Sequence, residues 1–231
     1  MEENSIIITE DGSTTIFNHA KNEHFHSIHG AVQESMHVFI NKGYRFILNE
    51  RLITEHSLNI LEVGFGTGLN ALLTFKDIIL NDDPLVVNYV GLEPNPIGFD
   101  VAGQLNYCYL LNIMFLQKAF LEMHSASPST RLNLSEKFSF TVEPIGLQQY
   151  SANNQLFDLV YFDAFSPATQ PELWDGSIFR KLYSIMNPGG VLVTYCSKGS
   201  VRRSMQQEGF VTERLPGPPG KHEMLRASKI K

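Results

Sequence analysis

The stretch LEVGFGTGLN, residues 61–70, has three glycines within five positions, directly after a run of apolar residues. The apolar run is typical of a buried strand, and the residues from Leu69 onward follow a helical pattern. Glycine tolerates positive φ and lets the backbone approach a ligand closely, which suits a corner between a strand and a helix. The stretch therefore predicts a strand, a tight turn and a helix that together bind a nucleotide-like molecule.

The order of Gly64, Gly66 and Gly68 differs from the dinucleotide fingerprint G-x-G-x-x-G, whose third glycine would stand at the position of Leu69. The next predicted strand, YVGLE, ends at Glu93. This acid comes later than the one that holds the ribose about 20 residues beyond the dinucleotide fingerprint. The spacing therefore disfavours NAD as the ligand.

Short apolar runs alternate with helical patterns from residue 59 to the end of the chain. Strands are predicted at NILEVG, LVVNYVGLE, FSFTVE, FDLVYFD, GGVLVTYC and EMLRAS, with helices between most of them. Such alternation predicts right-handed βαβ units and a parallel sheet, an α/β fold covered by helices on both faces. Ligands of such sheets bind beyond the carboxyl ends of the strands, so residues just after each strand are candidate site residues.

Residues 1–55 precede this pattern and are expected to form an N-terminal part. SIIITEDGSTTIF, residues 5–17, has two β-prone runs around Asp11 and Gly12, which predicts a hairpin. GAVQESMHVFINKG, residues 30–43, has apolar residues at helical spacing, and Gly43 is expected to end this helix as its C-cap. Residues 56–231 are expected to form the main domain, against which the hairpin and the helix pack.

The composition is that of an ordinary globular chain, with 43% hydrophobic and 18% charged residues. No apolar window is long enough to cross a bilayer, and the acidic N-terminus does not resemble a signal peptide. Cys108 and Cys196 are too few for a disulfide framework or a zinc cluster, so we expect two reduced thiols in a cytoplasmic protein. His24, His26 and His29 lie in an irregular segment without a nearby fourth ligand, and no metal site is expected there.

The net charge of −6, taken alone, argues against a nucleic-acid partner. The charge is uneven, however, because eight Lys or Arg and only three Glu lie between residues 198 and 231. These residues predict either a basic face or the solvated ends of the last helix and strand. The charges alone do not decide between the two.

A second group of candidate residues follows the predicted strand FDLVYF, residues 157–162. Asp163 falls at the carboxyl end of this strand, at the same sheet edge as Gly64 and Glu93. Phe165 and Trp174 follow in a proline-containing loop that is too apolar for an ordinary surface segment. An acid and aromatic rings at this edge could form the floor and wall of a site for a planar substrate. The alternative is a helix-capping Asp with two core rings.

The glycine corner, followed by an acid that ends the next strand, resembles motifs I and II of the class I S-adenosylmethionine-dependent methyltransferases. The resemblance implies that the corner borders the methionine part of S-adenosyl-L-methionine and that Glu93 binds the ribose hydroxyls. It also implies a Rossmann-like, mostly parallel sheet with an antiparallel strand near the C-terminus. A tight turn in another α/β protein is the alternative. The residues implied in cofactor binding are Glu62, Gly64, Phe65, Gly66, Thr67, Gly68, Asn70 and Glu93.

Four further segments extend the resemblance over nearly the whole chain: NEHFHSIHGAVQESMHVFI, FDAFSPATQPELW, MNPGGVLVTYCSKGSVRRSMQQEGF and PGKHEML. In this order they are similar to the tRNA 5-aminomethyl-2-thiouridine methyltransferases. The resemblance implies methyl transfer from S-adenosyl-L-methionine to the exocyclic amine of 5-aminomethyl-(2-thio)uridine at the tRNA wobble position. The chain has no second glycine fingerprint, so we expect it to lack the FAD domain of the bifunctional relatives.

The resemblance also suggests roles on the substrate side of the site. Asp163 would orient the amine and accept its proton, and Phe165 would stack on the uracil. Glu34 matches a family glutamate in the lead-in segment and would border the cofactor or amine pocket. Glu143 would contact the adenine of the cofactor. Ser166 stands where the family pattern has alanine, a small change that should leave the loop shape intact.

Cationic residues of the C-terminal motifs would contact phosphates around the tRNA anticodon loop, which would reconcile an acidic protein with an RNA partner. An exposed helix start with structural ion pairs explains Arg202 and Arg203 equally well. The cationic candidates are Lys198, Arg202, Arg203 and Lys221.

Two competing functions fit parts of the pattern. An aminopropyltransferase of the spermidine synthase type has a similar sheet and glycine corner, and it also joins an amine to a sulfonium compound. The aromatic loop AFSPATQPELW and the basic C-terminal stretch fit a tRNA nucleotide better than a polyamine. A cofactor-binding subunit without catalysis is the second alternative, against which the joint presence of Glu62, Glu93 and Asp163 argues.

Overall fold

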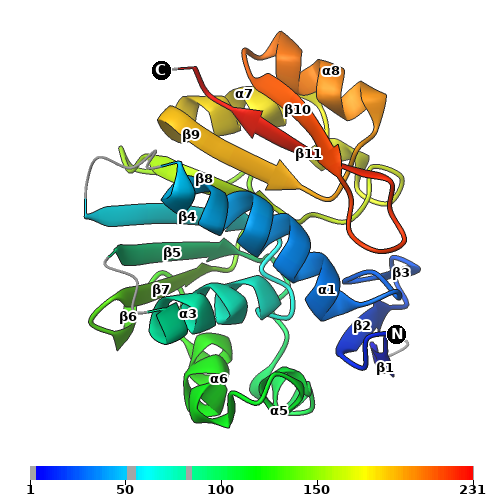
Figure 1. Ribbon diagram of the computed structural model, residues 1–231, viewed down its shortest axis with the longest axis vertical. Helices are drawn as coiled ribbons and strands as arrows, with labels where there is room; N and C mark the ends of the chain where they lie inside the picture. Colours follow the sequence, from blue (N-terminus) through cyan, green and yellow to red (C-terminus); the bar gives the residue numbers. More distant parts are fainter. Residues whose placement is uncertain (1–3, 51–55, 82–84, 231) are drawn as a thin grey trace.

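A single eight-stranded sheet forms the centre of the molecule in the computed structural model, which describes residues 4–50, 56–81 and 85–230 (Figure 1). The strands lie in the order β10-β11-β9-β8-β4-β5-β7-β6. Their bounds are β4 (Ser57–Val63), β5 (Val86–Leu92), β6 (Leu132–Ser135), β7 (Phe138–Glu143), β8 (Phe157–Phe162), β9 (Met186–Thr194), β10 (Val211–Pro216) and β11 (Glu223–Ser228).

The five central strands β9, β8, β4, β5 and β7 pair in parallel. Strand β11 pairs antiparallel with both β9 and β10, and β6 pairs antiparallel with β7 at the other edge. The predicted fold class is therefore confirmed, including the antiparallel strand near the C-terminus. The pattern did not predict β6 and β10, whose residues alternate weakly and are mostly half-buried or exposed.

Alternation along β4 divides the core into two layers. Leu58 and Ile60 face one hydrophobic cluster, whereas Leu61 and Val63 face the other, as the two-residue period of a strand requires. The first layer contains an N-terminal helical segment, α3 (Leu69–Asn81) and α6 (Gln117–Ser125), and the second contains α7 (Gly176–Ile185) and α8 (Gly199–Gln207). Because both faces are covered, the carboxyl ends of the strands remain as the place for a site.

The N-terminal helix is longer than predicted. It runs through α1 (Ala31–Ser35), the wider π-helical turns of η1 (Met36–Tyr44) and α2 (Arg45–Asn49), so the expected C-cap at Gly43 is wrong. A Cβ at Gly43 would lie 3.0 Å from Val193 and 3.2 Å from Tyr161. The glycine allows close packing of the helix on β8 and β9, a role that its place in the sequence did not reveal.

The segment after β5 is also more broken than predicted. The helical pattern of PIGFDVAGQLNY, residues 96–107, does not give one continuous helix. Two short helices, α4 (Phe99–Ala102) and α5 (Tyr107–Leu110), are followed by the 3₁₀ turn η2 (Met114–Leu116) that leads into α6. No helix in the described ranges is both long and apolar enough to cross a membrane.

A small antiparallel sheet lies at the carboxyl end of the large one (Figure 1). It consists of β1 (Ser5–Ile8), β2 (Thr14–Asn18) and β3 (Glu23–His24), and the predicted hairpin around Gly12, whose φ is 83°, is confirmed. The Glu23 carboxylate accepts hydrogen bonds at 3.0 Å from both the backbone N–H and the hydroxyl of Ser166. The small sheet is thus tied to the loop after β8. The expected domain boundary between residues 55 and 56 touches residues outside the described part of the chain.

Candidate functional site

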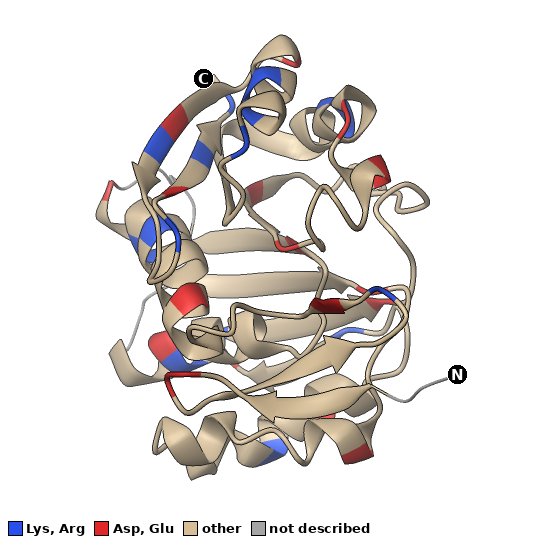
Figure 2. Ribbon diagram, turned by 90° about the vertical axis from the view of Figure 1, so that its right-hand side faces the viewer, with Lys and Arg blue, Asp and Glu red and all other residues tan. Residues whose placement is uncertain are grey.

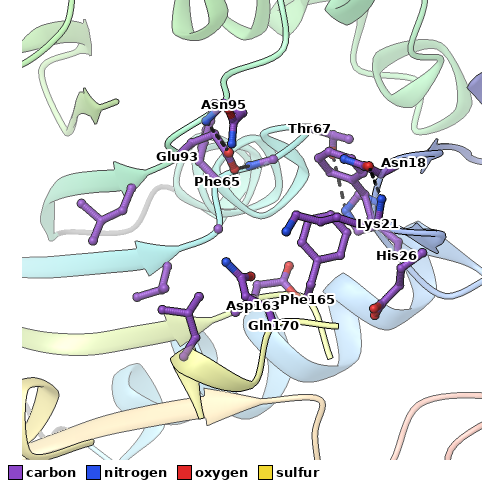
Figure 3. Close-up of a pocket in the computed structure, with 18 of the residues that line it drawn as sticks. Asn18, Lys21, His26, Phe65, Thr67, Glu93, Asn95, Asp163, Phe165 and Gln170 are labelled. Carbon is purple, nitrogen blue, oxygen red and sulfur yellow. Dashed lines mark hydrogen bonds between the residues drawn. The ribbon is translucent and has the colours of Figure 1, made fainter. Parts of the chain in front are cut away.

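A cavity of about 690 Å³ opens at the carboxyl end of the large sheet. It is lined by the glycine corner after β4, by residues that follow β5, β8 and β9, by the small N-terminal sheet, and by Lys221 from the loop between β10 and β11. Figure 2 looks at this end of the molecule, and Figure 3 shows the lining side chains. A cavity of this size, lined by both apolar and polar side chains, is typical of a small-molecule site.

The glycine corner is shaped by contacts within the protein. Gly64, Gly66 and Gly68 have φ values of 88°, 51° and 73°, which favour glycine. A Cβ on Gly64 would lie 2.5 Å from the carbonyl oxygen of Asp163, and one on Gly68 would lie 2.8 Å from Nε2 of His124. The backbone is bare at these two positions because neighbouring segments fill the space.

Thr67, between the last two glycines, is held on three sides. The Tyr107 hydroxyl donates to its Oγ1 at 3.1 Å, and Nε2 of His124 donates to its carbonyl oxygen at 3.1 Å. His26 Nε2 lies 3.4 Å from the same Oγ1. Burial lowers the pKa of both His26 and His124 to about 4, so both rings are neutral near pH 7. The corner is therefore held by contacts within the protein itself.

Glu93, which follows β5, carries a carboxylate fixed by two backbone donors. The N–H of Gly66 and the N–H of Asn95 each donate to it at 3.0 Å (Figure 3). Burial raises the pKa of Glu93, and the two N–H groups oppose that rise. A fixed carboxylate beside a helix start is well suited to accept hydrogen bonds from a diol.

Asp163 follows β8, and its backbone N–H donates to the Val63 carbonyl oxygen at 2.9 Å. Its half-buried side chain lines the cavity and accepts a hydrogen bond of 2.8 Å from Nδ2 of Asn70. Burial, and secondly the Glu34 carboxylate, raise the pKa of Asp163 to about 7, against the opposing effects of Asn70 and Lys221. This carboxyl group can therefore gain or lose a proton near neutral pH.

Lys221 brings a cation into the acidic part of the cavity. Its ammonium group contacts the buried carboxylate of Glu34 and lies 3.9 Å from the ring centroid of Tyr195. The Tyr195 hydroxyl donates to the Ala164 carbonyl oxygen at 2.9 Å, and the Ser27 N–H donates to Glu34 at 2.9 Å. Four segments that are distant in sequence thus meet around one ion pair.

Phe165 forms an aromatic wall beside Asp163 (Figure 3). Its ring meets the ring of Phe25 edge to face, with 5.3 Å between centroids, and the Lys21 ammonium lies 5.3 Å from its centroid. The indole N–H of Trp174 donates to the Phe165 carbonyl oxygen at 2.8 Å. Trp174 itself is buried against Phe162, so it supports the wall from behind.

The structure brings most of the predicted site residues to this cavity. Those that line it are Glu34, Gly64, Phe65, Gly66, Thr67, Asn70, Glu93, Asp163, Phe165 and Lys221. Gly68 lies behind the corner. Lys198 and the α8 residues Arg202 and Arg203 do not line the cavity.

Two predicted cofactor residues also lie off the cavity. Glu62 is fully buried and accepts hydrogen bonds from the Tyr89 hydroxyl at 2.7 Å and from Asn70 Nδ2 at 2.8 Å. Glu143 accepts a hydrogen bond of 2.6 Å from the Ser129 hydroxyl, while the next loop, residues 146–149, lines the cavity. Glu62 is the last residue but one of β4, and Glu143 is the last residue of β7. The side chains of both acids face parts of the protein other than the cavity.

Sequence reasoning missed several lining residues, among them Lys21, Phe25, His26 and Tyr195. The position of Tyr195 directly after β9 was an available signal, since residues that follow parallel strands share one edge. The three others lie in or beside the small sheet, and no periodic pattern predicts that its loops reach the cavity. Within the described residues, no three His, Cys, Asp or Glu come together in a group that could hold a metal ion.

Known proteins share this architecture. A family described as S-adenosyl-L-methionine-dependent methyltransferase matches residues 115–230. The bifunctional protein MnmC of tRNA 5-methylaminomethyl-2-thiouridine biosynthesis from Idiomarina loihiensis is 30% identical over 87% of this chain and 34% of its own length. The corresponding protein from Leptospira interrogans is 26% identical over 88% of this chain and 32% of its own length. The chain thus spans about a third of these relatives.

Solved structures agree at the level of the fold. MnmC2 from Aquifex aeolicus is 25% identical and aligns with a TM-score of 0.77 over 99% of this chain and 71% of its own. Spermidine synthase from Thermotoga maritima aligns with a TM-score of 0.51 at 12% identity, over 97% of this chain and 72% of its own, which indicates a common fold. With the family match covering half of the sequence, the chain belongs to the S-adenosyl-L-methionine-dependent methyltransferases.

Proposed function

We propose that this chain transfers the methyl group of S-adenosyl-L-methionine to the primary amine of 5-aminomethyl-(2-thio)uridine at the wobble position of tRNA. The observation that carries the proposal is the half-buried carboxyl group of Asp163, with a pKa of about 7, between the glycine corner and the Phe165 ring. The names of the Idiomarina and Leptospira relatives support the choice of tRNA. A tRNA substrate implies activity in the cytoplasm.

The residues at one end of the cavity fit the cofactor. Glu93 would bind the ribose diol, and the Gly64–Gly66 backbone would border the methionine part. The loop of residues 146–149 replaces Glu143 as our candidate for the adenine contact, because this loop lines the cavity. S-adenosyl-L-methionine supplies an electrophilic methyl group on a sulfonium sulfur.

The other end of the cavity fits the acceptor. A primary aliphatic amine has a pKa near about 10 and is mostly protonated at neutral pH, so it needs a group that takes its proton. Asp163 would bind the ammonium group and accept a proton from it, which frees the nitrogen lone pair for the methyl carbon. Phe165 would stack on the uracil ring, and Glu34 with Lys221 would border the amine. Alignment of the two reactants can contribute about 7 to 11 kcal/mol to the lowering of the barrier.

The same geometry argues against a polyamine acceptor. Lys221 already occupies the space between Glu34 and the Tyr195 ring, so the acidic part of the cavity contains a resident cation. A polyamine would place further cations beside it, whereas the uridine carries a single amine on a neutral, planar ring. The likeness to spermidine synthase extends to the fold alone.

The tRNA would lie across the upper part of the view in Figure 2, where α8 carries Arg202 and Arg203 and no acidic residue. On β10 and β11, Arg214 and Arg226 pair with Glu223 and Glu213. Lys198 and Arg203 are exposed there and Arg202 is half-buried. Residues outside the cavity can hold the phosphates of an anticodon stem while a single base enters the cavity.

Methyl transfer from labelled S-adenosyl-L-methionine to tRNA from cells that lack the terminal methylation step tests the proposal. Nucleoside analysis of the labelled tRNA is expected to give 5-methylaminomethyl-(2-thio)uridine. The substrate assignment would be overturned if the protein bound the cofactor but left the tRNA unlabelled, and a polyamine or a protein received the label instead.

We expect that Arg203→Glu weakens tRNA binding and flattens its salt dependence. Removal of one interaction with a phosphate should reduce the slope of log K against log salt by roughly 0.7 to 0.9. Lys118→Glu is a matched control, because Lys118 is 88% exposed on α6, away from the basic C-terminal stretch, and the reversal changes the net charge equally. Equal slopes for the two variants would contradict the proposed tRNA surface.

A further inference from the structure

A chain of buried polar groups runs beneath the cavity floor and ends at Asp163. The Tyr89 hydroxyl donates to Glu62 at 2.7 Å, and Asn70 Nδ2 donates to Glu62 and to Asp163 at 2.8 Å each. Tyr89, Glu62 and Asn70 are 1%, 0% and 2% exposed. They come from β5, β4 and α3, so three elements converge on one side chain after β8.

The two carboxyl groups fix the orientation of the Asn70 amide. Asn70 Nδ2 lies between an oxygen of Glu62 and an oxygen of Asp163, and a flipped amide would place its carbonyl oxygen against the ionised Asp163 carboxylate. Among the described residues, Oδ1 of Asn70 has no hydrogen-bond partner although it is buried. An unpaired buried oxygen is unfavourable. The unfavourable burial of Oδ1 is offset by the two hydrogen bonds that Nδ2 of Asn70 donates to the acids.

We propose that Asn70 is a positioning residue that orients the Asp163 carboxylate toward the acceptor amine, and that Glu62 acts by fixing the amide of Asn70. This inference rests on the proposed function for the role of Asp163. It differs from the expectation that Glu62 and Asn70 bind the cofactor directly. A donated N–H favours the charged form of a carboxyl group, so Asn70 also keeps Asp163 available as a proton acceptor.

Other charged or titratable groups surround Asp163, and a change in their charge would also affect its pKa. Burial raises the pKa of Tyr89 and Tyr195 well above 10, so both stay neutral between pH 6 and 9. Burial also raises the pKa of Glu62. The groups on the neighbouring elements are Glu34 on α1, Glu62 on β4, Tyr89 on β5, Tyr195 after β9 and Lys221 between β10 and β11.

The test is the ratio of variant to wild-type turnover as a function of pH for Asn70→Leu, which keeps the shape of the side chain and removes the donor. Loss of the hydrogen bond raises the pKa of Asp163, so the ratio should be lowest near pH 6 and rise about tenfold toward pH 9. The pKa of the substrate amine cancels in this ratio. Thr74→Val is the matched control. It removes a buried hydroxyl one turn further along α3, which donates to the Asn70 carbonyl oxygen at 2.8 Å, and its ratio should be flat.

A carboxyl-carbon NMR titration of the free protein provides a readout that needs neither cofactor nor tRNA. We expect the Asp163 signal, assigned with Asp163→Asn, to titrate about one pH unit higher in Asn70→Leu than in the wild type.

Two substitutions of Glu62 test its role in fixing the Asn70 amide. Glu62→Gln, whose oxygen still accepts from Asn70 and whose nitrogen can donate to Tyr89, should retain more turnover than Glu62→Leu. If Asn70→Leu does not fold, Asn70→Ala removes the donor without adding an apolar side chain of the same size.

A flat ratio together with an unchanged Asp163 titration would overturn the positioning role. Absence of methyl transfer to tRNA by the wild type would refute the proposed function and leave the NMR comparison to decide the inference separately.

Discussion

Asp163→Asn is expected to lower methyl transfer to tRNA by about 10²- to 10⁴-fold, the usual contribution of a positioned proton acceptor. The asparagine keeps the size of the side chain, and its oxygen can still accept the hydrogen bond from Asn70. It cannot take a proton from the amine, and it loses the negative charge that would hold an ammonium group. Single-turnover measurement with saturating cofactor and tRNA gives this rate directly.

The same substitution should stabilise the folded protein at pH 8. The pKa of Asp163 is about 7 in the folded state and about 3.9 in an unfolded chain. Between these values the folded state binds the additional proton, so the contribution of Asp163 to stability falls as the pH rises from 4 to 7 and stays low above it. Asp163→Asn removes this loss of stability at high pH. The melting temperature should therefore increase by a few degrees at pH 8 and by less at pH 5.

Cofactor affinity of the Asp163→Asn variant should change little. Wild-type turnover in the variant would remove Asp163 from the mechanism.

The place of the site could be predicted from the sequence because the ends of parallel strands share one edge. The periodic patterns located β4, β5 and β8 closely enough to place Gly64, Glu93 and Asp163 together, and all three line the cavity. Local patterns suffice for this step, since the side-chain alternation within each strand fixes which residue comes last.

The partners of these residues could not be predicted in the same way. Glu34 and Lys221 are 187 positions apart in the chain, and no local pattern indicates that they form an ion pair. Glu62 belongs to the recognised motif, yet its side chain lies in the core beneath Asn70. The direction of a side chain at a strand end depends on the packing of several elements, and the resemblance to a family carries no information on it for this chain.

The glycines in the sequence indicated where the backbone needs to be bare, but they did not reveal whether a ligand or a neighbouring segment is the reason. Gly43 follows a helical pattern as a C-cap would, but the helix continues and the glycine permits contact with β8 and β9. The glycines after β4 suggest a ligand, and the structure shows that Asp163, Phe25 and His124 fill the space near Gly64, Gly66 and Gly68. A missing side chain in a sequence can therefore reflect a neighbour in the fold as readily as a bound molecule.

Gly64→Ala should therefore reduce stability in the free protein as well as turnover, whether or not the added methyl group also meets the cofactor. The added Cβ would lie 2.5 Å from the Asp163 carbonyl oxygen, and alanine would have to adopt a φ of 88°. Backbone strain and overpacking together should cost at least about 3 kcal/mol in the free energy of unfolding, or roughly 10 °C in melting temperature. Relief of the overlap would move the backbone that carries the Asp163 carboxylate, and a displacement of about 1 Å can lower turnover by about 10²-fold.

Gly98→Ala is the matched control for this prediction. Gly98 precedes α4 at the same end of the sheet, has an ordinary φ of −72°, and has open space where the Cβ would be placed. This substitution should leave turnover unchanged and alter the melting temperature only slightly, because it restricts the unfolded chain without strain in the folded one. If Gly64→Ala behaved like Gly98→Ala, the close approach of the corner to Asp163 would not be needed for activity. If a clash with the cofactor were the sole effect of the added methyl group, cofactor binding would weaken while stability stayed unchanged, so calorimetry of the free protein separates the two causes.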